Sequence, residues 1–451
     1  MQFELTKDFI DRLTDIIDRQ DSKAAISILD ELHSADIAEI YNELNIEQAK
    51  FLFLLLDNEK ASDVLAEIEE DDREEFLHAL PSEVIASHFL EEMDSDDAAD
   101  VLGDLPEGKK EEVLSHIKDA EQAGDIADLL SYDEDTAGGL MAKELVSVKE
   151  EWDVSLCIEE LRKQAEDVDE IYNVYVVDEH DRLKGLLPLK KLIISKPDVK
   201  VFSISEEVIS VTTDIDSEDV ANIMRKYDLV VLPVVDTDGK LVGRITIDDI
   251  VDVIQEEAEK DYQMASGIVQ DVEYSDNIVT QMRGRLPLLL IGLFGGVLGA
   301  LVLGYYEGDL IKYAGLALFI PLIMAMAGNV GIQASAIVVQ GIASKSMGIV
   351  SVFSKLTREL WLAFLIGIIC SGLIFAYNII FSDSIALSLT VSIALFSVII
   401  FTTLLGTVIP LMLNKMKIDP ALATGPFITT LNDIIGLLLY LVLGRILLPL
   451  F

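Results

Sequence analysis

An aspartate, Asp433, lies inside the last long apolar run of this sequence, which extends from Ala421 to Leu450. If a helix begins near Ala421, Asp433 lies about 12 residues along it, or about 18 Å at ~1.5 Å per residue. That depth is near the middle of a hydrocarbon layer ~30 Å thick. A carboxylate there is costly unless it faces water, a cation or a polar partner. Asp433 is therefore the first candidate for a functional residue.

Other oxygen-bearing side chains accompany this carboxylate. Asn329, Gln333 and Gln340 share one helical face of an earlier apolar run, and Thr429 lies one turn before Asp433. Carboxylate, amide and hydroxyl oxygens suit hard divalent cations, and no Lys or Arg lies deep in these runs to neutralise the aspartate. We predict a cation path with Asp433, Asn329 and Thr429 as its pore residues.

Three other interpretations of these polar residues remain open. Buried amides often hold helices together by hydrogen bonds. Asp433 could be a protonated carboxyl bonded to a neighbour, or one member of a proton relay. A relay normally uses several titratable groups, and the interiors of the apolar runs contain no Glu or His. The cation path is therefore favoured.

Carboxylates also form two stripes in the more polar part of the chain. Residues three or four apart share one face of a helix, and like charges at that spacing repel by ~0.2–0.5 kcal/mol per pair. A divalent cation bridging two such stripes would reverse the sign, which is the logic of a cation sensor. The alternative is a solvated acidic face. The stripes are Asp249, Asp252, Glu256 and Glu259, and Asp96, Asp100 and Asp104.

The chain divides into two chemically different parts. All but six of its 79 acidic residues and all but seven of its 34 basic residues precede Leu286. The acidic part argues against nucleic acid or anionic lipid as partners and favours cations, although adaptation to salt is an alternative explanation. The five histidines and two cysteines show no metal-ligand spacing, so softer metals are poorer candidates than Mg²⁺.

Two kinds of repeat organise the acidic part. Residues 1–135 show helical spacing throughout, with a recurring short motif that predicts stacked helices. Within 136–258, the segment 174–193 aligns without gaps with 232–251, and each copy predicts a strand, an acidic turn, a strand and a helix. This second repeat resembles a tandem pair of CBS domains.

A connecting helix, 247–285, with a candidate break at Gly267, leads to a membrane domain, 286–451. Five spans place the two termini on opposite sides, and the basic residues put the acidic part in the cytosol. The predicted spans are 286–306, 313–341, 358–380, 385–413 and 421–448. The basic residues on the cytosolic side are Arg283, Arg285, Lys345, Lys355, Arg358, Lys415 and Lys417; Lys312 and Arg445 lie on the other.

Glycine spacing in the first span bears on assembly. Gly292–Gly296 and Gly295–Gly299 are pairs that permit close helix approach. Five helices are few for enclosing a path, so we predict a symmetric homodimer; packing within one chain is the alternative.

The whole order of elements resembles the MgtE family of magnesium channels or transporters. The residues that carry the resemblance are YDEDTAGGLM at 132–141, PLIMAMAGNVGIQAS at 321–335 and DPALATGPFITTLND at 419–433. It implies a multidomain fold: an all-α helical superstructure, an α/β CBS pair, a connecting (plug) helix and a five-helix transmembrane domain. It also implies a homodimer with a pore aspartate at Asp433.

The resemblance further implies that cytosolic Mg²⁺ binds acidic residues and holds the closed state. The implied regulatory positions are Asp96, Asp100, Glu218, Asp228, Asp249, Asp252, Glu257, Asp261 and Asp419, with Asp96 versus Asp97 left open. ATP binding between the CBS modules is also implied, although no strong nucleotide motif is present.

We therefore expect a Mg²⁺-selective, channel-like uptake protein of the plasma membrane, and not an enzyme. The alternatives are a cation-coupled carrier, a broader divalent transporter that also carries Co²⁺ or Mn²⁺, and a sensor whose membrane part is only an anchor.

Overall fold

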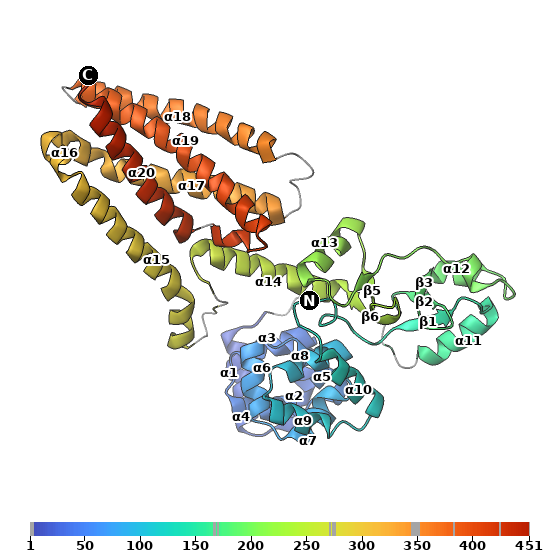
Figure 1. Ribbon diagram of the computed structural model, residues 1–451. Coiled ribbons are helices and arrows are strands. Elements are labelled where there is room, and N and C mark those ends of the chain that lie inside the picture. Colours follow the sequence, from blue (N-terminus) through green and yellow to red (C-terminus); the bar gives the residue numbers. More distant parts are fainter. Residues whose placement is uncertain are drawn as a thin grey trace. The chain divides into compact units, whose positions relative to one another are not determined.

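The computed structural model describes residues 4–165, 168, 171–269, 272, 277–343, 352–381, 384–423 and 425–450. It divides into two compact units, Met1–Gln255 and Glu256–Phe451, which are treated separately below. Figure 1 shows short helices and two small sheets in the first unit and long helices in the second.

Short helices separated by caps make up the N-terminal part of the first unit. Side chains of Thr6, Asp21, Asn45, Asp57 and Asp119 accept hydrogen bonds from the first turns that they precede, which explains why each helix starts there. The elements are α1 (Lys7–Asp18), α2 (Ser22–Leu29), α3 (Ser34–Tyr41), α4 (Ile46–Phe53), α5 (Asn58–Ala66), α6 (Glu70–His78), α7 (Ser82–Val84), the π-helix η1 (Ile85–Leu90), α8 (Ser95–Gly103), α9 (Glu107–Leu114) and α10 (Ala120–Leu129).

These helices stack layer on layer. Lys60 Nζ donates to Leu29 O, 31 residues earlier, and Lys109 Nζ donates to Leu77 O, 32 residues earlier. Phe76 lies between the aromatic rings of Phe53 and Phe89, at centroid distances of 5.3 and 5.8 Å. Hydrogen bonds that recur at a nearly constant sequence separation are expected where similar helices stack on one another.

The CBS pair contains two three-stranded sheets with the same topology. In each sheet the first strand is parallel to the second, which is antiparallel to the third. One sheet holds β1 (Val146–Lys149), β2 (Val174–Val177) and β3 (Leu183–Leu187), and the other holds β4 (Val211–Thr212), β5 (Val231–Val235) and β6 (Leu241–Thr246). The helices of this part are α11 (Val154–Gln164), α12 (Leu189–Ile194), the 3₁₀ turn η2 (Val201–Ser203) and α13 (Ser217–Tyr227).

The two copies also pack on each other symmetrically. Leu183 N donates to Gly239 O, and Leu241 N donates to Asp181 O. These bonds relate equivalent positions of the repeat, so the two copies form a pseudo-dimer.

The connecting helix α14 (Ile247–Ser266) ends at Gly267, whose φ of +92° is favourable only for glycine. It is therefore shorter than the predicted 247–285, because residues from Ile278 onward belong to the first apolar helix. The second unit continues with α15 (Ile278–Tyr305), α16 (Glu307–Lys312), the 3₁₀ segment η3 (Ala314–Phe319), α17 (Ile320–Ala343), α18 (Val352–Phe381), α19 (Ile385–Lys415), the 3₁₀ turn η4 (Pro420–Ala423) and α20 (Pro426–Leu447).

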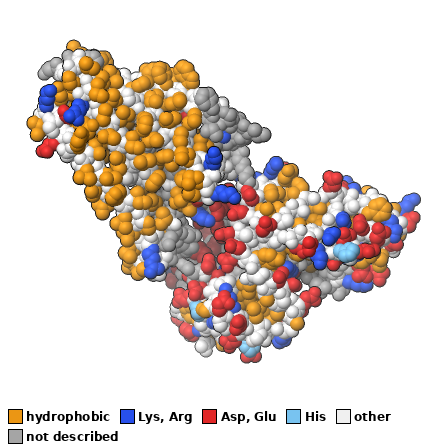
Figure 2. Space-filling view, in the orientation of Figure 1, with side chains coloured by type: hydrophobic (Ala, Val, Ile, Leu, Met, Phe, Trp, Pro, Cys, Tyr) orange, Lys and Arg blue, Asp and Glu red, His pale blue; other side chains and the backbone are white. Residues whose placement is uncertain are grey.

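Five spans of the second unit are long and apolar enough to cross a membrane. Hydrophobic side chains cover most of the visible face of these helices, whereas many acidic and basic side chains are scattered over the visible face of the first unit (Figure 2). The predicted fold class is thus confirmed. Lys345, one of the charges used for the orientation, lies outside the described residues.

Candidate functional site

Asp433 lies nearer the start of its helix than the sequence predicted. The 3₁₀ turn η4 and the positive φ of Gly425, +64°, delay the start of α20 to Pro426. Asp433 is then seven residues along the helix, which is about 10 Å rather than about 18 Å. The expected start near Ala421 was wrong because the apolar run contains this break.

The side chain of Asp433 lies against a glycine of α17. A β-carbon at Gly328 would lie 3.2 Å from Asp433 Oδ1 and 3.0 Å from Thr429 Cγ2. The Thr429 hydroxyl donates to Gly425 O at 2.9 Å, within its own helix. Among the described residues, no hydrogen bond or ion pair is made by Asp433. The structure thus brings Asp433 and Thr429 together against Gly328, a position of α17 that has no side chain.

Asn329 follows Gly328 directly and is exposed on α17, as are Gln333 and Gln340. The predicted polar face of α17 is therefore exposed among the described residues. The polar positions of α20 divide differently. Tyr440 is buried and donates to Leu316 O at 2.8 Å, so it packs the helices together and does not line a path.

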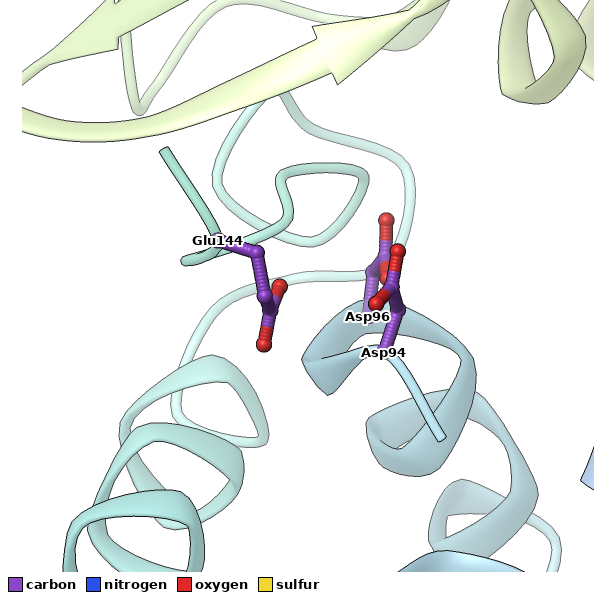
Figure 3. A group of neighbouring side chains, drawn as sticks. All are labelled: Asp94, Asp96 and Glu144. Carbon is purple, nitrogen blue, oxygen red and sulfur yellow. The ribbon is translucent and has the colours of Figure 1, made fainter. Parts of the chain in front are cut away.

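A second group of carboxylates lies in the first unit. Oxygens of Asp94, Asp96 and Glu144 lie within 4.8 Å of one another (Figure 3). Asp94 and Asp96 come from the start of α8, and Glu144 comes from the segment before β1. Glu144 is held there by the backbone N–H and the hydroxyl of Ser95, at 3.2 and 2.8 Å.

Asp249 on α14 contributes to the same region. Its Oδ2 accepts hydrogen bonds from the backbone N–H and hydroxyl of Thr246, at 3.1 and 2.7 Å. Desolvation, followed by the charge of Asp249, raises the pKa of Asp96 well above its ordinary value. The pKa of Asp249 is also raised, chiefly by desolvation. The structure therefore brings Asp96 and Asp249 together.

Two further aspartates of α8 belong to this cluster. Desolvation and the charge of Asp249 raise the pKa of Asp97 to about 7, and desolvation and Asp97 raise the pKa of Asp100 to about 7. Because both Asp96 and Asp97 are affected by Asp249, the choice between them stays open. Protonation of these groups in the absence of metal is the expected response to such crowding.

One end of the predicted stripe is neutralised. Arg73 Nε donates to Asp104 Oδ2 at 2.6 Å, with side-chain exposures of 13% and 7%. The guanidinium also lowers the pKa of Asp97 and Asp100 against the dominant raising effects. Asp104, one of the three carboxylates of this stripe, therefore has a positive partner.

The donor set of the cluster fits a hard divalent cation. Every group is a carboxylate or hydroxyl oxygen, and the ligands of an octahedral Mg²⁺ ion lie ~3–4 Å apart, close to the observed spread. The positive end of α8 also favours nearby anions, but a helix terminus carries only about half a unit charge. The combined negative charge of the four carboxylates, when they are ionised, exceeds this value. They are Asp94, Asp96, Asp97 and Glu144.

Two other predicted positions face each other in the second unit. The charge of Asp419 raises the pKa of Asp261, after desolvation. Asp419 Oδ1 also accepts the backbone N–H of Ala421 at 2.8 Å. Glu257 forms an ion pair with Lys260 at 3.1 Å.

The remaining predicted positions are spread out. Glu218 is exposed at the start of α13, and Asp228 is the left-handed residue that ends that helix, so the two lie about 15 Å apart along it. Asp252 is exposed on α14, and desolvation and Asp248 raise its pKa.

Sequence reasoning missed Asp94, Glu144 and Arg73. Asp94 precedes the stripe, and Glu144 lies three residues after the motif that ends at Met141, so neither has helical spacing to mark it. Arg73 lies 31 residues before Asp104. The repeat length of the stacked helices was the signal that could have paired Arg73 with Asp104.

Comparison with known proteins agrees with this architecture. Residues 320–443 match a family model described as a divalent cation transporter, residues 32–135 match the MgtE intracellular N domain, and residues 137–196 and 199–256 match CBS domains. The matched family models and the fold thus define a membrane transporter of divalent cations with a cytosolic N-terminal part.

The relatives extend over nearly the whole chain. It is 33% identical over 441 residues to the magnesium transporter MgtE of Thermus thermophilus, covering 97% of this chain and 98% of that protein. It is 34% identical over 417 residues to the magnesium transporter MgtE of Bacillus subtilis, covering 92% of each. A crystal structure of the cytosolic domain of the Mg²⁺ channel MgtE in complex with ATP matches 53% of this chain and 98% of its own, with 37% identity and a TM-score of 0.50.

The chain belongs to the MgtE family of magnesium transporters. It is a membrane protein with a cytosolic N-terminal part, and its family consists of transporters rather than enzymes. The resemblance recognised from the sequence is confirmed.

Proposed function

We propose that this protein is a Mg²⁺-selective, channel-like transporter that carries Mg²⁺ into the cell across the plasma membrane. The proposal rests on one observation: Asp433 lies on an apolar helix beside Gly328 and forms no ion pair with the described residues. A mobile cation supplies the missing charge. Mg²⁺ dehydrates reluctantly, so Asp433 holds a largely hydrated ion through its water shell.

The membrane potential is a sufficient driving force. One elementary charge gains ~2.3 kcal/mol per 100 mV, so a divalent ion gains ~4.6 kcal/mol. Asn329 and Thr429 are the other proposed pore residues: Asn329 is exposed on α17 next to Gly328, and Thr429 lies one turn before Asp433, with its methyl group against Gly328.

Cytosolic Mg²⁺ closes the path by binding the acidic residues. Bound ion stabilises the arrangement in which the carboxylates of Asp96, Asp100 and Asp249 are close, and the arrangement loosens when Mg²⁺ is scarce. Their raised pKa values show how unfavourable their charges are without a cation. The other proposed regulatory positions are Glu218, Asp228, Asp252, Glu257, Asp261 and Asp419.

The working form is a homodimer with its pore between two membrane domains. Two surfaces of one chain support this: the exposed amides of α17, and the glycines Gly292 and Gly296 of α15, where a β-carbon would meet nothing within 4 Å. ATP binding by the CBS pair is supported by the ATP complex of the similar cytosolic domain.

Mg²⁺ uptake by vesicles that contain the purified protein tests the transport step. The Asp433→Ala variant should lose uptake, and near-normal flux would remove Asp433 from the pore. Single-channel currents that fall as cytosolic-side Mg²⁺ rises would support a gated channel. Saturable exchange without currents would instead indicate a carrier, and equal uptake of Co²⁺ or Mn²⁺ would indicate a broader transporter.

Protease digestion of the full chain tests the regulatory step separately. Protection of the acidic half should increase as Mg²⁺ is added, because bound ion holds its parts together. An unchanged digestion pattern would contradict a Mg²⁺ sensor without bearing on the pore.

A further inference from the structure

The residue before the pore aspartate is an amide that is fully enclosed. Asn432 has no exposed surface, although it lies on an apolar helix. Within the described part of the chain, neither its Oδ1 nor its Nδ2 has a hydrogen-bond partner. A buried amide in this condition costs more free energy than an apolar side chain of the same shape. Its presence therefore needs a reason other than helix stability.

Asn432 fills a notch left by a glycine of α17. A β-carbon at Gly331 would lie 1.7 Å from Asn432 Nδ2 and 2.8 Å from its Cγ, distances that no real contact reaches. On the neighbouring helix α19, a β-carbon at Gly406 would lie 2.5 Å from Gly331 O. Three helices thus meet at one point: Gly331 leaves room for the amide, and Gly406 lets α19 approach the Gly331 carbonyl.

The position of this amide fixes the direction of its neighbour. Successive residues of an α-helix point ~100° apart, so seating residue 432 in the notch sets where residue 433 points. Gly331 and Gly328 are three residues apart on α17, and they receive Asn432 and Asp433 respectively. The two contacts together set the rotation of α20 against α17.

We propose that Asn432 is a positioning residue: its amide, seated against Gly331, holds α20 in the rotation that aims the Asp433 carboxylate at the ion path. This inference rests on the proposed role of Asp433 in Mg²⁺ transport. It assigns no ion contact to Asn432 itself. Its effect on transport is exerted through the placement of Asp433.

The geometry supplies a compensating pair of substitutions. Gly331→Ala forces a methyl group into the amide, whereas Asn432→Ala removes the amide and leaves only its Cβ. That Cβ is 3.6 Å from the β-carbon position at Gly331, an ordinary contact. The double variant therefore refills the notch without a clash. Gly372→Ala on α18 is the matched control, because nothing lies within 4 Å of its β-carbon position.

Mg²⁺ uptake by vesicles containing each full-length variant is the measurement, with the Mg²⁺-to-Mn²⁺ uptake ratio recorded alongside. We expect Gly331→Ala to lower maximal uptake by about tenfold or more, since small displacements of a reacting group have effects of that size. The double variant should recover to within about threefold of the parent protein. Asn432→Ala alone should lower the Mg²⁺-to-Mn²⁺ uptake ratio by about threefold. Its elution volume in size-exclusion chromatography and its thermal unfolding temperature should stay unchanged.

The outcomes separate this inference from the proposed function. Parent-like uptake by Gly331→Ala, or a well-folded double variant no better than Gly331→Ala, would overturn the positioning role while Asp433 kept its own. An unchanged uptake ratio in Asn432→Ala would also overturn it, because a residue that only fills space does not alter selectivity. If the Asp433→Ala variant transports Mg²⁺ normally, the proposed function itself is wrong, regardless of the results for the Gly331 and Asn432 variants.

Discussion

Asp433 is the one acidic residue of the membrane helix α20, whereas the cytosolic part brings several carboxylates close together. Asp433 lies beside a glycine, whereas Asp94, Asp96 and Glu144 gather within 4.8 Å of one another. The affinity of an oxygen site for a divalent ion rises with the number of its charges. A single carboxylate suits a transport site, from which the ion must dissociate quickly. A crowded cluster suits a sensor site, where the ion must stay bound for longer.

The two regions also differ in their positive charges. Arg73 pairs with Asp104 at 2.6 Å, and Arg244 lies 3.9 Å from Asp94. The described residues give Asp433 no such partner. A fixed guanidinium group beside carboxylates lowers their affinity for a cation. In the membrane, a fixed cation would compete with the ion that has to pass.

The largest effect is expected from the single carboxylate. Asp433→Asn keeps the size of the side chain and removes its charge, so Mg²⁺ uptake should fall by about 100-fold or more. Asp433→Glu should retain part of the uptake, and Mg²⁺-dependent protease protection of the acidic half should match the parent in both. Loss of that protection in Asp433→Asn would contradict the separation of the two roles.

The sequence predicts the elements of both regions more completely than their neighbours in space. The repeat at 174–193 and 232–251 predicts two strands in each copy, and the registers of β2–β3 and β5–β6 agree down to a bulge after Val176 and after Val234. The parallel strands β1 and β4 lie outside the repeat and were not predicted. Asp433 is found by its chemistry alone, because a carboxylate in an apolar run needs no alignment to be noticed.

Neighbours that meet through tertiary packing carry no local signal. Glu144 reaches the cluster because Ser95 binds it, and Arg73 reaches Asp104 through the stacking of helices 31 residues apart. Helix starts fail for a related reason: hydropathy continues through the turn at Pro420–Ala423, so the pattern hides where α20 begins. A pattern along the chain reports periodicity, not contacts between distant segments.

The second prediction removes one charge from the crowded region. Asp249→Asn keeps an oxygen for the two hydrogen bonds from Thr246, so the local fold should persist. The Mg²⁺ concentration for half-maximal protease protection should rise by roughly 30-fold, since one carboxylate fewer faces the ion. Asp198→Asn, on an exposed turn, is the control and should not change it. An unchanged midpoint in Asp249→Asn would take this residue out of the sensor.

The third prediction concerns pH. The pKa values of Asp97 and Asp100 are about 7 in the fold, above the ordinary carboxyl value of ~4. Between these values the folded state binds more protons than the unfolded state, so without Mg²⁺ the free energy of unfolding falls as pH rises from ~4 to ~7.

Protons and Mg²⁺ also compete for these oxygens. The half-maximal Mg²⁺ concentration for protease protection should therefore be about tenfold higher at pH 6 than at pH 8. Asp97→Asn and Asp100→Asn should each flatten this dependence. A midpoint that is equal at both pH values would show that these carboxyls do not bind the ion.

The smallest effect should come from the fixed cation. Arg73→Gln removes a positive charge near Asp97 and Asp100, so Mg²⁺ should bind more tightly, with the half-maximal concentration about threefold lower. The same change leaves Asp104 without its partner and should lower the thermal unfolding temperature when Mg²⁺ is absent. Added Mg²⁺ should restore part of that loss, because the ion replaces the missing charge.

Arg19→Gln is the matched control for this last prediction. Arg19 also pairs with an aspartate, Asp15, at 2.8 Å, but both side chains are more than half exposed. Such a pair contributes little to stability, and it lies on α1, outside the cluster, so neither Mg²⁺ affinity nor unfolding should change. Weaker Mg²⁺ binding in Arg73→Gln would mean that the arginine serves to hold Asp104 in place rather than to offset its charge. The contrast with Asp433 would then rest on the number of carboxylates alone.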